Sequence, residues 1–82
     1  MSMQQTEART FTVTGPLGRF AQGDVLKSDK DVVDYHRNIL AECGVHGEGL
    51  SAPLILAVVR SVAGDGEDAE MERVEKLELL ID

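Results

Sequence analysis

Three side chains could ligate a soft metal ion: His36, Cys43 and His46. His36 and Cys43 are seven residues apart, so a helix would place them on one face, and His46 follows shortly after. Glu42 and Glu48 are near in sequence, so three or four ligands for a zinc-like ion could converge. The spacing matches no closed structural zinc motif, which pairs close ligands on two segments. We therefore favour a buried, apolar Cys43 and a solvated His46, and we predict neither a metal nor a cofactor.

Catalytic motifs are weak in this chain. Ser51 lacks the G-x-S-x-G setting of a hydrolase nucleophile, and Cys43 could pair with His36 only if their shared face lined a cleft. The glycines of residues 15–18 come without the lysine of a phosphate loop or the spacing of a dinucleotide site. We expect no catalytic activity of this chain on its own.

Charge is concentrated at the end of the chain. Residues 65–82 hold eight acids against Arg73 and Lys76, whereas residues 1–64 hold seven acids and six bases. Without a basic cluster, we expect neither nucleic acid nor an anionic membrane as a partner. The acidic stretch 64–70 does not have the order of ligands that a calcium-binding EF-hand loop needs, so it predicts a solvated turn. Its charge could still attract a protein with a basic surface.

The 82 residues predict a single small domain over 9–82, after a disordered start at 1–8. Cys43 is the lone cysteine, so no disulfide can form within the chain, and a reducing, cytoplasmic location is expected. The first residues do not resemble a signal peptide, and the longest apolar run, residues 54–59, is far shorter than a membrane span.

Alternation of polar and apolar residues over 10–14 predicts a strand that directs Phe11 and Val13 into the core. A turn at 15–18, a short strand through Phe20 and Ala21, a second turn and the apolar pair Val25-Leu26 would complete a β-hairpin or a small bent sheet.

A helix is predicted over 29–43. Ser28 can cap it, two aspartates lie in its first turn, and Gly44 can end it. One apolar stripe recurs at helical spacing, formed by Val32, Val33, His36, Ile39, Leu40 and Cys43.

The second half of the chain allows two interpretations. Residues 52–63 could form a helix capped by Ser51, or a central strand rich in β-branched residues. Residues 67–81 are good helix formers with Met71, Val74, Leu77 and Ile81 on one side, but Leu77, Leu79 and Ile81 also alternate. The chain is α+β in both cases, either a hairpin with three helices or a ββαββ arrangement.

The function predicted from these features is protein–protein interaction or assembly, with the chain forming a homo-oligomer. If 52–63 were a strand with two apolar faces, a second copy could cover one of them. The predicted interface residues are Leu54, Ile55, Leu56, Val58 and Val59. The alternatives are a small metal-binding or accessory subunit that uses His36, Cys43 and His46, and an acidic inhibitor of a basic protein site.

Overall fold

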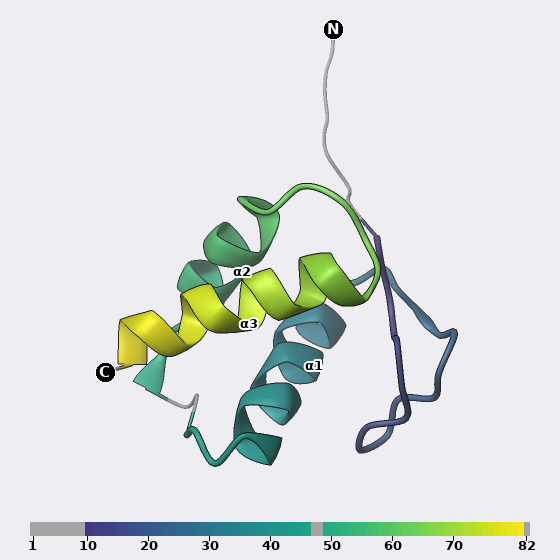
Figure 1. The fold of residues 1–82 in the computed structure, drawn as a ribbon, viewed down its shortest axis with the longest axis horizontal. Helices are drawn as coiled ribbons and strands as arrows, with labels where there is room; N and C mark the ends of the chain where they lie inside the picture. Colours follow the sequence, from purple (N-terminus) through teal and green to yellow (C-terminus); the bar gives the residue numbers. More distant parts are fainter. Residues whose placement is uncertain (1–9, 47–48, 82) are drawn as a thin grey trace, which may run out of the picture.

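The computed structural model describes residues 10–46 and 49–81, so the predicted disordered start at 1–8 and the candidate ligand Glu48 lie outside the described residues. The described chain forms β1 (Phe11–Thr12), β2 (Val25–Leu26), α1 (Asp29–Glu42), α2 (Ala52–Arg60) and α3 (Glu67–Ile81). The predicted α+β class is confirmed, and the second half is helical. Each helix contacts the other two, and the hairpin lies to one side of them (Figure 1).

The two strands are antiparallel, with Phe11 opposite Leu26 and Thr12 opposite Val25. Phe11 and Val13 are buried, as their alternation predicts. The pairing extends beyond the strands, because the Val13 N–H donates to the carbonyl of Asp24 at 2.8 Å and the Val13 carbonyl accepts from the Gly23 N–H at 2.9 Å. The hairpin therefore holds its apolar face against the helices.

The segment predicted as the second strand, around Phe20 and Ala21, forms a tight bend instead. Leu17 and Phe20 make an isolated bridge closed by two backbone hydrogen bonds of 2.9 Å. Because the chain reverses within these four residues, the segment that pairs with β1 is Val25–Leu26.

Side chains occupy the edge of β1 that faces away from β2. The Thr12 N–H lies 3.1 Å from both carboxylate oxygens of Asp65, and the Thr14 N–H donates to the Tyr35 hydroxyl at 3.4 Å. Asp65 and Tyr35 thus take the place of a third strand and satisfy backbone donors that a sheet edge would leave unpaired.

α1 begins and ends with the caps that its sequence predicts. The Ser28 hydroxyl accepts from the Asp31 N–H at 3.2 Å. At the other end Gly44 has φ +80°, and the N–H of Val45 donates to the Leu40 carbonyl at 2.8 Å. This is a Schellman arrangement, in which a glycine takes the left-handed conformation and reverses the chain. It places Val45 beside the end of α1.

As a helix, α2 places apolar residues that are four apart on one side, where the rest of the protein buries them. Ile55 and Val59 are fully buried between the other helices. The Ser51 hydroxyl accepts from the Leu54 N–H at 3.3 Å. At the far end of the helix the Arg60 guanidinium lies 2.5 Å from the Asp29 carboxylate, which joins the end of α2 to the start of α1.

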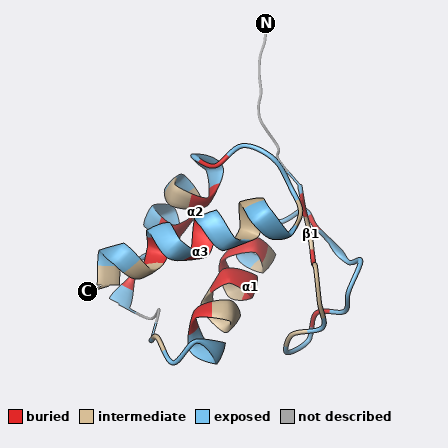
Figure 2. Ribbon diagram, viewed as in Figure 1, coloured by how far each residue is buried: buried red, intermediate tan, exposed pale blue. Residues whose placement is uncertain are grey.

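α3 turns Arg73, Val74 and Leu77 into the protein and leaves its outer side exposed (Figure 2). None of the helices in residues 10–46 and 49–81 is long and apolar enough to cross a membrane. The buried core draws on the hairpin, the connections and all three helices: Phe11, Val13, Phe20, Leu26, Val32, Val33, Tyr35, Leu40, Leu50, Ile55, Val59, Val74 and Leu77.

Candidate protein-binding surface

The three candidate metal ligands do not converge. His36 is fully buried, whereas Cys43 and His46 are exposed beyond the end of α1. The prediction of a buried Cys43 is therefore wrong, because this residue caps the helix where the chain reverses. Tyr35, which the predicted stripe omits, is buried. Within residues 10–46 and 49–81, no group of three or more His, Cys, Asp or Glu side chains is arranged to hold a metal ion.

His36 has a structural role. Its Nε2 lies 3.2 Å from the Nε–H of Arg73, which can only donate, so Nε2 accepts and the ring proton is on Nδ1. Nδ1 then donates to the Val32 carbonyl at 2.8 Å. Burial of the ring lowers the pKa of His36 to about 4. A neutral imidazole with both nitrogens bonded is available neither as a ligand nor as a general base.

Arg73 is a buried residue that the sequence pattern does not predict, because its type and its place in an acidic stretch indicate a solvated base. The side chain is fully buried, with its guanidinium 4.6 Å from the centre of the Phe11 ring. Its Nη1 donates to the Gly64 carbonyl at 3.4 Å. The spacing to Leu77, one helical turn further on, is the signal that could have placed Arg73 on the buried face.

A second polar cluster joins α3 to α1 and the hairpin. The Tyr35 hydroxyl donates to Oε2 of Glu70 at 2.5 Å, and the Thr14 hydroxyl donates to Oε1 at 2.9 Å. Burial, together with the hydrogen bond to Glu70, raises the pKa of Tyr35. Although partial burial opposes it, hydrogen bonds from Thr12 and Gly66 lower the pKa of Asp65. The acidic stretch 64–70 is therefore not simply a solvated turn.

The predicted interface residues of α2 divide into two groups. Ile55 and Val59 belong to the core of the chain itself, so a partner cannot contact them in the folded protein. Their prediction as interface residues depended on a strand with two apolar faces, whereas the segment is the helix α2. Leu54 is 40% exposed, and Leu56 and Val58 are half-buried. Of the five predicted interface residues, these three remain accessible to a partner.

Large apolar side chains of α3 are exposed to water. Met71 is 65% exposed and Leu79 is 76% exposed. The prediction that Met71 shares the buried side with Val74 and Leu77 is wrong, because Arg73 and Leu77 define the centre of that side and Met71 lies at its margin. Apolar groups of this size are more often turned inward, so their exposure marks a surface of interest.

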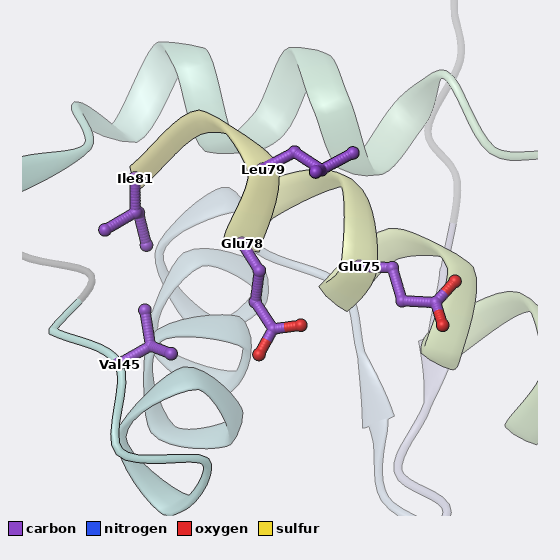
Figure 3. Close-up of a pocket in the computed structure, with 5 residues that line it drawn as sticks. All are labelled: Val45, Glu75, Glu78, Leu79 and Ile81. Carbon is purple, nitrogen blue, oxygen red and sulfur yellow. The ribbon is translucent and has the colours of Figure 1, made fainter.

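Two hollows lie between α3 and the C-terminal end of α1. One has a volume of about 560 Å³ and is lined by Val45, Glu75, Glu78, Leu79 and Ile81. Figure 3 shows Val45 and Ile81 pointing toward one another, with Glu78 on the same side of the helix and Leu79 directed away from Val45.

The second hollow lies nearer the start of α3. Its apolar lining comes from Ile39, Cys43, Met71 and Val74, and its acidic lining includes Glu70. Residues 71, 74, 78 and 81 recur at helical spacing along one side of α3, so the two hollows lie one after the other along that side, where it meets the end of α1. We call this the α1–α3 groove and define it by the residues that line the two hollows: Thr14, Ile39, Cys43, Val45, Glu67, Asp68, Glu70, Met71, Val74, Glu75, Glu78, Leu79 and Ile81.

The charge of the groove is negative. Both bases of α3 are directed elsewhere, since Arg73 is buried and the Lys76 ammonium lies 3.9 Å from Glu72, outside the groove. Neither α1 nor α3 has a basic residue in its last turn, so the negative ends of both helix dipoles near Val45 are not offset by their own side chains. Among the described residues that line it, the groove thus combines apolar side chains with carboxylates and includes no Lys or Arg.

Comparisons with known proteins matched the chain to no family model, no curated protein and no solved structure. Its function therefore has to be inferred from the chemistry of its own surface.

Proposed function

We propose that this chain is a protein-binding module without catalytic activity of its own, and that it holds its partner in the α1–α3 groove. The observation that carries the proposal is the groove itself, where an apolar floor between two helices is open to solvent and flanked by exposed Met71 and Leu79. Grooves between helices are common docking sites for an amphipathic segment of another protein.

The state of the polar residues supports a binding role over a catalytic one. His36 and Tyr35 are buried titratable groups of α1, and hydrogen bonds to Arg73 and Glu70 engage them within the fold. Cys43 lies at the groove, but the imidazole of His36 is turned into the core, so the pair predicted as a possible nucleophile and base is not assembled.

A partner of different sequence fits the groove better than a second copy. A symmetric contact between two copies would bring the acidic lining of one groove against the acidic lining of the other. Like charges facing one another disfavour such a contact.

Self-assembly through α2 is a second candidate, favoured by the exposure of Leu54. Light scattering on a sizing column at several concentrations tests it. A mass above that of one chain that falls to the monomer value in Leu54→Glu would support this candidate. A monomeric wild type would remove it and leave the groove.

Site-specific photo-crosslinking tests the groove. A photoreactive residue at Met71 should give a discrete adduct with another protein in the cells that express the chain, whereas one at exposed Ala57 on α2 should not. The same adduct from both positions, or none from Met71, would contradict the proposal. The Met71 adduct should also be lost when Glu78→Lys is added, which ties it to the groove.

A further inference from the structure

We infer that the partner segment is an amphipathic helix whose apolar stripe is flanked by Lys or Arg, and that its basic end lies at the Val45 and Ile81 end of the groove. This inference rests on the proposed function, and it specifies the chemistry of the partner. It depends on the shape, the charge and the dipoles of the groove.

The shape sets the kind of segment. On α3 the lining of the groove runs from Glu67 to Ile81, which at ~1.5 Å per residue is roughly 21 Å, or about four turns of a partner helix. Apolar contacts are spread along this length, from Ile39 and Val74 in one hollow to Val45 and Ile81 in the other. A helix with apolar residues at three- and four-residue spacing matches such a floor.

The charge sets the flanking residues. Glu67, Asp68 and Glu70 line one hollow, while Glu75 and Glu78 line the other. Glu70 already accepts hydrogen bonds from Tyr35 and Thr14, so the remaining carboxylates are the ones that can meet a cation from outside. Basic residues beside the apolar stripe of the partner would face them.

The helix dipoles set the orientation. The C-terminal ends of α1 and α3 both lie near the hollow of Val45 and Ile81, and neither carries a basic side chain in its last turn. A Lys or Arg from the partner would therefore be most stabilised at this end, where the partial negative charges of two helices add to Glu75 and Glu78.

The test uses the full chain and three synthetic helical peptides of about four turns. The probe has a Leu stripe flanked by Lys. The second peptide replaces each Lys by Glu, and the third has the composition of the probe but a scrambled order. Calorimetry or fluorescence anisotropy should show binding of the probe, with affinity that falls as salt increases, and much weaker binding of the other two.

Matched variants of the chain locate the peptide. Glu78→Lys, inside the groove, should weaken probe binding about tenfold, whereas Glu72→Lys makes the same charge change outside the groove and should have little effect. Likewise Met71→Ser should weaken binding, and Leu80→Ser, also exposed but outside the groove, should not. Circular dichroism should confirm that all four variants keep their helices.

The outcomes separate this inference from the proposed function. Equal weakening by groove and control variants would mean diffuse charge attraction and would overturn the inference, as would equal binding of the scrambled or the Glu peptide. If the probe fails to bind while Met71 still crosslinks to a partner, the partner class is wrong and the binding function stands. If both experiments fail, the proposed function fails as well.

Discussion

At the scale of single residues, the feature that most constrains this protein is the contact between His36 and Arg73, which joins α1 to α3 inside the core. Each side chain is fully buried, and each satisfies a polar atom of the other. The charge of Arg73 is tolerated because its guanidinium stacks on Phe11 and bonds to a backbone carbonyl. A neutral His36 is therefore part of what allows a cation to be buried.

We predict that this contact makes the fold acid-sensitive. The pKa of His36 is lowered from 6.5 to about 4, so between these values the unfolded chain binds a proton that the folded chain does not. The contribution of neutral His36 to the free energy of unfolding is therefore complete above pH 6.5 and decreases as the pH is lowered to about 4. The total loss from this residue reaches about 3 kcal/mol. Arg73 opposes protonation and Glu70 favours it, while the pKa of Tyr35, the other group packed on the ring, lies far above this range.

Urea unfolding at a series of pH values measures this effect, and His36→Gln serves as the control because carboxylates also titrate in acid. The difference in unfolding free energy between wild type and variant should change between pH 6.5 and 4. A difference that stays constant over this range would show that His36 is not the sensitive group.

Replacing Arg73 should be costly. Arg73→Ala removes the stacking on Phe11 and leaves both a cavity and an unpaired His36 nitrogen, so we expect a loss of about 3 kcal/mol. Arg73→Lys should also destabilise the fold, because an ammonium lacks the planar fork that reaches His36 and Gly64 together. Denaturant unfolding measures both. A Lys variant as stable as wild type would mean that charge alone matters.

At the scale of elements, each is completed by contacts from elsewhere in the chain. β1 has only two residues, and its free edge is closed by Asp65 and Tyr35 instead of by a strand. α2 has nine residues, too few to be stable alone, and it persists because one side of it is buried.

Asp65→Ala should loosen the hairpin. Loss of the carboxylate leaves the Thr12 N–H without its acceptor, at a cost of about 1 kcal/mol. Amide hydrogen exchange at Thr12 should then become faster, while Glu67→Ala, a neighbouring exposed acid, should leave it unchanged. Equal acceleration by both variants would attribute the effect to general charge.

The two sides of α2 should respond differently to truncation. Ile55→Ala empties a fully buried position and should cost about 3 kcal/mol, whereas Leu54→Ala, at a partly exposed position, should cost less than about 1 kcal/mol. Thermal or urea unfolding measures both. Similar losses would indicate that Leu54 is buried in solution, as it would be in a homo-oligomer.

At the scale of the whole molecule, most of the net charge of −7 is carried by residues 65–82, and we expect it to lower the stability of the fold while it favours binding of a basic partner. Glu78→Lys brings the net charge to −5, because one acid is exchanged for one base, and it supplies a cation in the last turn of α3. We expect a gain of about 0.5 kcal/mol in unfolding free energy together with weaker binding of the basic probe. A variant that loses stability as well would argue that Glu78 supports the fold.

The amino-acid sequence alone was sufficient to predict the α+β class, the hairpin, and the start and end of α1, because caps, turns and the alternation of polar and apolar residues are local signals. It was also sufficient to locate the excess of acid in the last quarter of the chain. It left residues 52–63 and 67–81 undecided, since a short apolar run satisfies a helix and a buried strand equally well.

Only the tertiary structure decided which side chains face inward. The structure places Ile55 and Val59 in the core, and it places Met71 and Cys43 at the surface. It also buries Arg73, a residue type that is almost always exposed. The physical reason is that burial depends on what the other elements present: Arg73 can enter the core because Phe11, Gly64 and a neutral His36, each distant from it in sequence, surround its charge there. The α1–α3 groove has the same origin, since the end of α1 and the side of α3 form it only when the helices pack.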